Sequence, residues 1–426
     1  MKRHFVRIKW GLLLIALCGY GCSYGQAASG DAGRPAPPDN SIRIGKTEEI
    51  HSFVLNEQRR ILVSLPGSYY DTYFYKRRYP VVYLLDGDSH FFSVTAMIKQ
   101  MSEDGGLAFP EMIVVGILNT DRNRDLTPTR DTSEVRMGRG ASNHSGGGPK
   151  FMEFLAGELI PHIDSAFPTA PYRVFIGHSL GGLMAVDALV NHPGLFNGYL
   201  AIDPSMWWDK AKLLRQVQAG GMDFHGSSLF LAGANSLQAG LDTVSVMKDT
   251  ATIFSRHMQS IFGLRNELLR MGVAEHLYFG WKYYPEYNHG SVPLVAEYDG
   301  LRNLFDFYRF ELRHDEMEEP GFKGDTLLAA HFALVSRRMG YTVSPPEVVV
   351  NNIGYSLMAH GQASRAFYYF HMNVENYPNS FNVYDSMGDW YLAQGKKDMA
   401  IKSWEKALSL REWPDTRKKL QKLKTQ

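Results

Sequence analysis

Cysteine is almost absent from this sequence. The chain of 426 residues has two cysteines, Cys18 and Cys22, and both lie near its first residue. If export removes this segment, the mature protein has no thiol, which excludes a structural disulfide and a catalytic cysteine. Long apolar runs are scarce as well. The run from Trp10 to Cys18 is about half of the ~20 residues that a spanning helix needs, so we expect no transmembrane segment in the mature chain.

Charge of one dominant sign is also lacking. Forty-five Lys plus Arg face 44 Asp plus Glu, which leaves a formal net charge of +1. No field of one sign is available to gather nucleic acid or an anionic membrane, so we expect no nucleic-acid partner and look for pockets instead. With 44% hydrophobic and 13% aromatic residues, the chain can form a large core and a second unit.

The first residues are typical of a secretory leader. Basic residues within positions 2–9 precede the apolar run, and small residues follow it. We therefore predict a signal peptide over residues 1–27 and an exported protein, periplasmic or extracellular. Acylation of Cys22 would instead anchor the chain as a lipoprotein, and this alternative stays open.

The remaining chain divides into three parts. Residues 28–40 are rich in Gly, Ala, Pro and Asp, and we expect a disordered lead-in there. Over residues 41–314, strand-like runs such as PVVYLLDG, MIVVGIL, RVFIGHS, GYLAIDPS and SLFLAG are separated by segments of crossover length. This alternation predicts an α/β fold of the α/β-hydrolase type, with a mostly parallel sheet between helices. Its predicted helices are 151–166, 180–192, 251–271 and 292–312, and its last strand lies near 281–285.

Strand signals end near residue 314, and residues 315–426 have helical periodicity. Four pairs of residues recur 34 positions apart, namely Gly354 and Gly388, Gly361 and Gly395, Ala366 and Ala400, and Phe370 and Trp404. This period is that of tetratricopeptide helix pairs. Two copies are fewer than an independent solenoid usually needs, so we expect them to pack on the preceding segment or on the α/β part. These C-terminal helices suggest a protein partner or a dimer contact, although an internal core also explains their apolar positions.

The sharpest local signal is GHSLGG at residues 177–182, directly after an apolar strand and before a helix. It fits the Gly-x-Ser-x-Gly turn, which presents its serine at the carboxyl edge of the sheet. We predict Ser179 as the nucleophile. A serine hydroxyl needs a base, and the chain order of this fold is serine, acid, histidine. His289 follows the last predicted strand, so we predict it as the general base.

The acid and the oxyanion site are less defined. The acid usually follows the penultimate strand, but SLFLAG runs into Ala-Asn-Ser. We rank Asp242 and Glu286 equally, ahead of Asp249, and a Ser-His pair oriented by a backbone carbonyl or by Asn235 is a further alternative.

For the oxyanion we expect the N–H of Leu180 and an N–H from the turn with Gly87 and Asp88. The lack of a side chain at Gly87 would allow the backbone to approach the substrate closely. An ordinary tight turn also explains the Asp-Gly-Asp sequence.

The chain resembles the esterase group of α/β-hydrolases that includes esterase D, ferric-enterobactin esterases and feruloyl esterase domains. The resemblance extends over residues 41–311 and is carried by YLLDGDSHF, by the Asn119–Pro128 segment, by SGGGPKFMEFL, YRVFIGHSLGGL and DPSMWW, and by HGSVP. It implies ester hydrolysis without a metal or organic cofactor, with Ser179 and His289 as the catalytic pair. The missing carboxylate after the penultimate strand and the long insertion over 235–280 depart from the group.

Substrate contacts are also predicted. Trp207 and Trp208 would form a flat apolar wall, or pack in the core. Arg122, with Arg124 and Asp125, would bind a polar leaving group, or the three would pair with one another. No His or Cys cluster has metal-ligand spacing, so we expect no catalytic metal.

The sequence thus predicts a serine esterase for an acylated sugar, a phenolic ester or a siderophore ester. The alternatives are an acyltransferase of the same fold, and a binding or scaffolding protein that acts through its helical tail.

Overall fold

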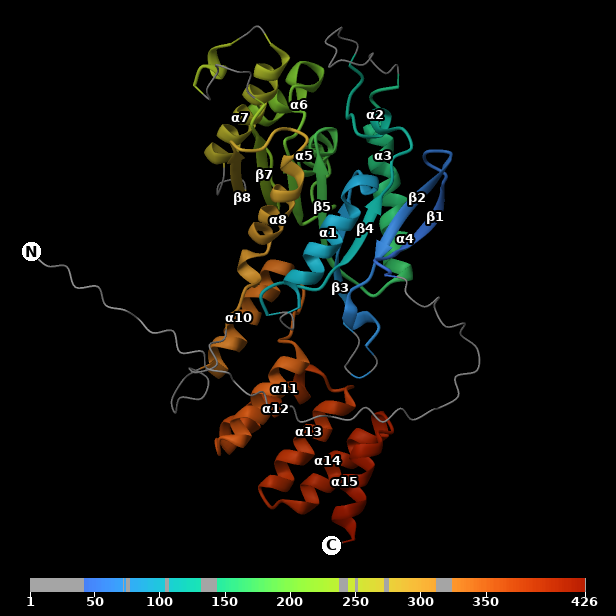
Figure 1. The fold of residues 1–426 in the computed structure, drawn as a ribbon, viewed down its shortest axis with the longest axis vertical. Coiled ribbons are helices and arrows are strands. Elements are labelled where there is room, and N and C mark those ends of the chain that lie inside the picture. Colours follow the sequence, from blue (N-terminus) through green and yellow to red (C-terminus); the bar gives the residue numbers. More distant parts are fainter. Residues whose placement is uncertain are drawn as a thin grey trace, which may run out of the picture. The chain divides into compact units, whose positions relative to one another are not determined.

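The computed structural model of the chain describes residues 42–71, 73, 77–103, 107–131, 144–236, 244–249, 252–271, 276–311 and 324–425 (Figure 1). By their contacts, residues from Ile44 onward form one compact unit. The predicted signal peptide, the predicted lead-in and the predicted boundary between residues 314 and 315 lie outside the described residues and stay predictions.

One sheet joins all the strands in the described part of the chain, in the order β1-β2-β4-β3-β5-β6-β7-β8. The strands are β1 (Lys46–Ser52), β2 (Glu57–Ser64), β3 (Tyr79–Leu84), β4 (Ile113–Ile117), β5 (Thr169–His178), β6 (Gly198–Ile202), β7 (Ser228–Ala234) and β8 (Tyr278–Tyr284). β1 pairs antiparallel with β2, and β2 with β4. All other pairs are parallel, which confirms the predicted α/β-hydrolase type of sheet.

Helices cover both faces of this sheet (Figure 1). They are α1 (Gly87–Met101), α2 (Arg122–Asp125), α3 (Gly148–Phe154), α4 (Ile160–Ala166), α5 (Leu180–Asn191), α6 (Trp208–Ala219), α7 (Ile253–Met271) and α8 (Val292–Leu304). Successive strand residues point to opposite faces. Val81 and Tyr83 therefore join the core formed with α3 to α7, whereas Val82 and Leu84 join the core formed with α1 and α8.

Two predicted helices differ in detail from the structure. The helix predicted over 151–166 begins at Gly148 and contains a π-helical turn at Leu155–Leu159. The helix predicted over 292–312 ends at Leu304, and a short 3-10 turn follows at Asp306–Tyr308.

The tail is helical, as predicted, with α10 (Gly324–Met339), α11 (Glu347–Ala359), α12 (Ala363–Asn376), α13 (Phe381–Ala393), α14 (Lys397–Leu410) and α15 (Pro414–Lys424). The 34-residue period has a structural basis, since α13 and α14 repeat α11 and α12. An added Cβ at Gly354 would lie 2.7 Å from the Phe370 ring, and one at Gly388 would lie 2.4 Å from the Trp404 ring. In both copies a glycine lets the paired helix approach with its aromatic residue. The assignment to the tetratricopeptide class itself stays a prediction.

The first tail helix packs on the α/β part. On α10, the Nε2 atom of His331 lies 3.0 Å from the backbone oxygen of Tyr308, and the Phe332 and Tyr308 rings meet at 6.2 Å. The Arg338 guanidinium lies 3.6 Å from the ring centroid of Tyr278 on β8. The tail therefore continues the core on the α8 side of the sheet. None of the described helices combines the length and the apolarity that a membrane span requires.

Candidate active site

Ser179 lies on the sharp turn between β5 and α5, with φ 60° and ψ −114°. Such a backbone conformation is strained for a residue with a side chain and is found mainly at functional sites. The turn is tight enough that a Cβ at Gly177 would lie 2.2 Å from the carbonyl of Gly181. The Ser179 N–H donates to the Ile202 carbonyl at 2.9 Å, which ties the turn to β6. The Ser179 hydroxyl is therefore presented at the carboxyl edge of the sheet.

His289 comes from the turn between β8 and α8, and its Nε2 atom lies 3.1 Å from the Ser179 hydroxyl oxygen. The side-chain oxygen of Asn288 accepts from the N–H groups of Gly290 and Ser291 at 3.0 and 3.1 Å, so the turn is held closed. Ser179 and His289 are 110 residues apart in the chain. The fold brings the predicted nucleophile and the predicted base within hydrogen-bond reach.

A different carboxylate from those predicted contacts His289. The Oδ2 atom of Asp203 lies 2.5 Å from Nδ1 of His289, and the Asp203 side chain has no exposed surface. Glu286 is exposed to solvent, and the structure pairs His289 with Asp203 and not with Glu286. Asp249 accepts from the Ser255 hydroxyl instead. Asp242 lies outside the described residues.

The backbone of Asp203 explains why an acid from β6 reaches the usual acid position. Asp203 directly follows β6 with φ 42°, and its N–H donates to the Ala232 carbonyl at 2.8 Å. Its Oδ1 atom accepts from the N–H of Ala234 at 2.8 Å. The left-handed turn thus directs the Asp203 carboxylate over the end of β7. The usual triad acid of this fold would have followed β7 and occupied the same place.

Three donors surround the Asp203 carboxylate. Besides Ala234 and His289, the Nε2 atom of His257 on α7 lies 2.9 Å from Oδ2. Burial by itself raises the pKa of Asp203, but the hydrogen bonds and charges of His257 and His289 outweigh it and hold that pKa well below its usual range. Asp203 is therefore ionised at neutral pH.

One carboxylate and two imidazoles meet at Asp203, and these are residue types that also bind metal ions. Ligand atoms of Asp203, His257 and His289 lie within 4.8 Å of one another, and this donor set suits Zn²⁺. The two contacts of 2.5 and 2.9 Å are hydrogen-bond distances. An ion bound at roughly 2.0–2.2 Å from each ligand atom would force these atoms apart. The geometry fits two hydrogen bonds to one carboxylate, and the absence of a catalytic metal stays a prediction.

The candidate oxyanion donors lie beside the nucleophile. Leu180 and Gly87 are the first residues of α5 and α1, and the first N–H groups of a helix have no intrahelical acceptor. The two helix starts are close, since a Cβ at Gly181 would lie 3.4 Å from Oδ2 of Asp86. The side chain of Asp88 accepts from the Asn119 amide at 2.9 Å, so it is engaged next to this turn.

The structure adds a packing reason for the glycine at position 87. An added Cβ there would lie 2.7 Å from the Gly116 carbonyl carbon, so the small residue lets α1 approach β4, and its close approach to a substrate stays a prediction.

Arg122 fixes the turn before α1. Its guanidinium donates to the Asp86 carboxylate at 2.6 and 2.9 Å and contacts the His178 carbonyl at 3.3 Å. About a third of the Arg122 side chain, 34%, is exposed. The predicted substrate residue therefore links the two helix starts at the oxyanion position and keeps an exposed portion.

Comparisons with known proteins agree with this geometry. Residues 52–239 match the family model described as "Putative esterase". Over these residues the chain is similar to this esterase family.

Two curated relatives to which the chain is similar are named as siderophore esterases. The siderophore triacetylfusarinine C esterase of Aspergillus fumigatus is 28% identical over 200 residues, which are 45% of this chain and 64% of that protein. The ferri-bacillibactin esterase of Bacillus subtilis is 34% identical over 153 residues, which are 33% of this chain and 52% of that protein. The chain thus spans less than two thirds of the length of either relative. Among solved structures, an IroE-like serine hydrolase from Shewanella oneidensis has 29% identity and a TM-score of 0.64, with 78% of this chain and 99% of that chain covered.

Trp207 and Trp208 lie at the start of α6. Both Trp207 and Trp208 are half-buried. The Nε1 atom of Trp208 donates to the Thr129 carbonyl at 2.9 Å, and its ring packs against the core below α5 and α6. Trp208 also borders a cavity of about 270 Å³ to which Ser179, Asp203 and His289 do not contribute. Packing therefore explains Trp208, and a contact of Trp207 with substrate stays a prediction.

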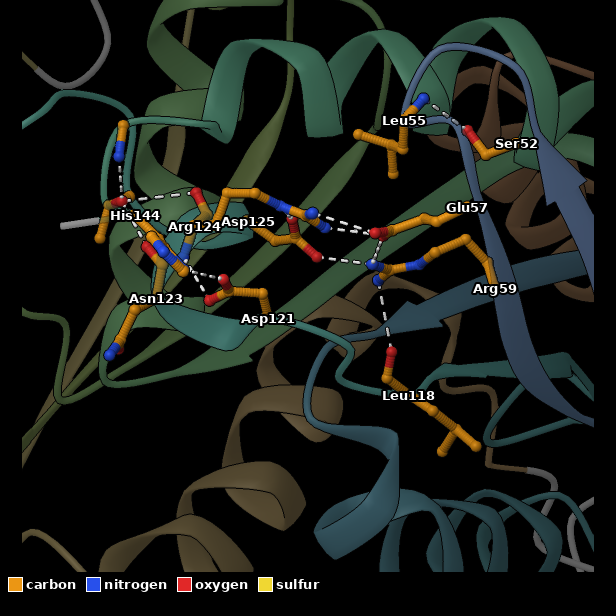
Figure 2. Close-up of polar contacts among 12 residues, drawn as sticks. Ser52, Leu55, Glu57, Arg59, Leu118, Asp121, Asn123, Arg124, Asp125 and His144 are labelled. Carbon is orange, nitrogen blue, oxygen red and sulfur yellow. Dashed lines mark hydrogen bonds and ion pairs between the residues drawn. The ribbon is translucent and has the colours of Figure 1, made fainter. Parts of the chain in front are cut away.

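Arg124 and Asp125 belong to a buried ion network (Figure 2). Arg59, only 1% exposed, donates to Asp125 at 2.6 Å and to Glu57 at 2.9 Å. Arg124 bridges the same two carboxylates at 2.7 Å and at 2.6 to 3.0 Å. The alternative in which these charges pair with one another is therefore correct for Arg124 and Asp125.

Sequence reasoning missed two residues of the site. Asp203 stands in the DPSMWW segment, directly after the apolar strand 198–202 and between the serine and the histidine in chain order. A carboxylate at the end of a parallel strand was the signal that could have found it. His257 is one of 15 histidines and lies in mid-helix, so no local signal distinguishes it.

Proposed function

We propose that this protein is a serine esterase that hydrolyses carboxylic esters through an acyl-enzyme. The observation that carries the proposal is the chain of contacts from the Ser179 hydroxyl to His289 Nε2 and from His289 Nδ1 to Asp203, at 3.1 and 2.5 Å. This is the arrangement that acyl transfer by serine requires, recognised by geometry and not by sequence position. The names of the relatives and the family match support the same activity.

The proposed reaction has two halves. The Ser179 oxygen attacks the ester carbonyl carbon while His289 Nε2 takes the hydroxyl proton, and the carbonyl oxygen becomes an oxyanion. Collapse breaks the bond to the alcohol oxygen, which leaves with the proton from His289. Water then attacks the acyl-enzyme, gives its proton to His289, and releases the carboxylic acid and Ser179. Asp203 stays ionised throughout and stabilises the imidazolium of His289.

Charge on the substrate oxygen needs donors that are in place before the reaction. We assign this role to the N–H groups of Leu180 and Gly87, at the starts of two helices whose dipoles favour negative charge there. Arg122 supports this site because it holds Asp86, the residue before Gly87, with two hydrogen bonds. Each such donor contributes on the order of 3 kcal/mol to the transition state in comparable sites.

For the substrate, we propose a siderophore ester, ahead of an acylated sugar or a phenolic ester. Two curated relatives are named as siderophore esterases. The partly exposed guanidinium of Arg122 beside the nucleophile turn offers a hydrogen-bond donor to an oxygen-rich ligand.

A substrate panel tests the proposal. Acetylated, feruloylated and siderophore esters are incubated with the wild-type protein and with the Ser179→Ala variant. The proposal expects turnover of the siderophore ester by the wild type and none above background by the variant. Equal turnover by both proteins would refute the esterase assignment, and turnover of only another ester class would refute the substrate assignment.

An acyltransferase shares the first half of this reaction, with an alcohol in place of water in the second. Product analysis with added alcohol acceptors separates the two, because only a transferase forms the new ester as its main product. No contact described around Ser179 favours an alcohol over water in the second half of the reaction, so hydrolysis is the function we propose.

Export and assembly are separate proposals. We propose that the leader over residues 1–27 directs export. Mass analysis of the N-terminus of the mature protein would distinguish simple cleavage from acylation of Cys22. A protein partner or dimer contact through the tail is tested by measuring the mass of the full-length protein in solution, where a monomer would contradict a dimer.

A further inference from the structure

A second histidine shares the carboxylate of the candidate triad. His257 on α7 is 4% exposed, and its Nε2 atom lies 2.9 Å from the same Asp203 oxygen that meets His289. The two imidazole rings are 5.4 Å apart and nearly perpendicular, at 86°. Two imidazoles therefore converge on one oxygen atom, and the proposed reaction uses only one of them.

The environment of His257 fixes which of its nitrogens carries the proton. The Nδ1 atom is buried and has no hydrogen-bond partner among the described residues. If Nδ1 held the only proton, the Nε2 lone pair would face an ionised carboxylate oxygen at 2.9 Å, which is repulsive. The proton is therefore on Nε2, and His257 donates to Asp203. Leaving Nδ1 unpaired costs free energy, and this cost needs a compensating role.

The helix that carries His257 is packed against the sheet. Ser260, one turn further along α7, donates to the His257 carbonyl at 2.7 Å. The neighbouring Met258 and Phe262 pack in a core with Trp281 and Tyr283 of β8. A donor on a packed helix is a fixed point from which the carboxylate can be oriented.

Asp203 needs such a fixed point because it comes from β6. Among the described residues, its Oδ1 atom accepts from one N–H, that of Ala234, about which the carboxylate could turn. The second oxygen must stay aimed at His289 for the base to keep its tautomer. A donor from His257 to that oxygen removes this freedom.

We propose that His257 is a positioning residue of the triad, which donates from Nε2 to Asp203 and thereby aims the carboxylate at Nδ1 of His289. The inference rests on the proposed function, because it assigns a role within that reaction. His257 contacts Asp203, whereas His289 contacts the Ser179 hydroxyl, so we assign His257 a role that acts through Asp203.

Three substitutions separate this role from packing. His257→Leu removes the donor, His257→Gln keeps an amide donor at a similar reach, and His257→Asn has the same amide on a shorter side chain. Met258→Leu is the matched control, since it changes the packing of α7 without touching Asp203. With p-nitrophenyl acetate, kcat of the Leu variant should fall roughly 10- to 100-fold at unchanged KM, as when a hydrogen-bond partner that orients a functional side chain is removed. The His257→Gln variant should recover most of the wild-type kcat. The His257→Asn variant should be as slow as His257→Leu, because its amide does not reach Asp203. The Met258→Leu control should have the wild-type kcat.

A spectroscopic measurement reports on the triad directly. The proton between His289 Nδ1 and Asp203 should give a downfield proton resonance in the wild type. It should move or broaden in His257→Leu and return in His257→Gln. A folded Leu variant with wild-type kcat and an unchanged resonance would overturn the proposal. If the Leu variant does not fold, equal rates for Gln and Asn would overturn it instead.

Labelling of Ser179 by a fluorophosphonate keeps this test independent of the substrate. If the wild type is labelled but turns over no ester, the proposed function fails, and the labelling rates of the His257 variants still decide the positioning role. If the wild type turns over esters and all variants react at its rate, the positioning role fails and the esterase stands.

Discussion

Asp203 and His289 are joined by a 2.5 Å contact across the carboxyl end of β7, although neither residue belongs to that strand. The acid follows β6 and the histidine follows β8, so a triad is completed without any carboxylate directly after β7. The amide N–H of Ala234, the last residue of β7, serves only to orient Asp203. This relationship identifies the residue on which the rate should depend.

Asp203→Asn should lower kcat by roughly 10³- to 10⁴-fold, because an amide can hold the imidazole in the wrong tautomer and cannot stabilise its charge. Steady-state rates on p-nitrophenyl acetate measure the effect. Glu286→Gln is the matched control, since Glu286 is exposed and precedes His289 by three residues. A full loss with Glu286→Gln and a normal rate with Asp203→Asn would assign the acid to Glu286 and refute this account.

Acid should destabilise the protein through His178. Burial, and then the charge of the neighbouring His289, lower the pKa of His178 to about 3. In the unfolded chain His178 takes up a proton at the ordinary histidine pKa of about 6.5, whereas in the folded protein it stays neutral until the pH is much lower. The contribution of His178 to the free energy of unfolding is therefore complete above pH 6.5 and is lost as the pH falls toward 3.

Calorimetry over this pH range tests the effect. The Tm of the wild type should fall more steeply with acidification than that of His178→Gln, which cannot titrate there. His371→Gln, an exposed site on α12, should keep the wild-type slope. If Tm falls equally with pH in the wild type and in His178→Gln, His178 is not held in its neutral form by the fold.

The nucleophile turn should not accept a methyl group at Gly177. Its Cβ would lie 2.2 Å from backbone atoms of Gly181, which cannot move away without opening the turn. We expect Gly177→Ala to destabilise the fold by about 2 kcal/mol or more, as for overpacked sites, and to abolish activity. Gly157→Ala has nothing within 4 Å of the new Cβ and should be close to neutral. Urea unfolding of both variants measures the difference, and equal midpoints would contradict the geometry.

The ion network in Figure 2 should matter for stability and not for chemistry. Asp125→Asn leaves the buried Arg59 with Glu57 as its remaining carboxylate partner. We expect a loss of about 3 kcal/mol, the lower end of the range for breaking a buried pair, with kcat per folded molecule unchanged. Glu412→Gln breaks an exposed pair with Arg417 and should leave the unfolding midpoint close to that of the wild type. A similar unfolding midpoint for both variants would show that the Arg59 pair is not desolvated.

Chelation provides a separate test. In the proposed reaction Ser179, His289 and Asp203 supply the nucleophile, the base and the negative charge. Dialysis against EDTA should therefore leave the rate on p-nitrophenyl acetate unchanged. A loss of activity that Zn²⁺ restores would instead place an ion between Asp203, His257 and His289.

Much of the fold and part of the site could be predicted from the sequence. The turn around Ser179 carries its own signal, because Gly177 is required by a contact with Gly181 in the same turn. His289 follows from chain order and from its place after the last strand. The glycine and aromatic pairs of the tail are likewise local to each helix hairpin, so their period is visible in the sequence.

The acid and its second histidine could not be predicted with the same certainty. The direction of the Asp203 side chain depends on a left-handed φ and on bonds to Ala232 and Ala234 of β7, which are tertiary features. His257 reaches Asp203 only because α7 packs beside β7 and β8. The position after β6 marks Asp203 as a candidate, but no neighbour in sequence reveals its contact with His289 or with His257.

The most direct test of the triad is to find which residue a fluorophosphonate labels. Ser205 is the stringent internal comparison, since its hydroxyl lies 3.3 Å from that of Ser179 but is not paired with His289 in the structure. After inhibition to completion, peptide mass spectrometry should find one phosphonyl group per chain, on Ser179, and labelling should be lost in His289→Ala. An adduct on Ser205 or elsewhere, or an unlabelled wild-type protein, would contradict the central claim.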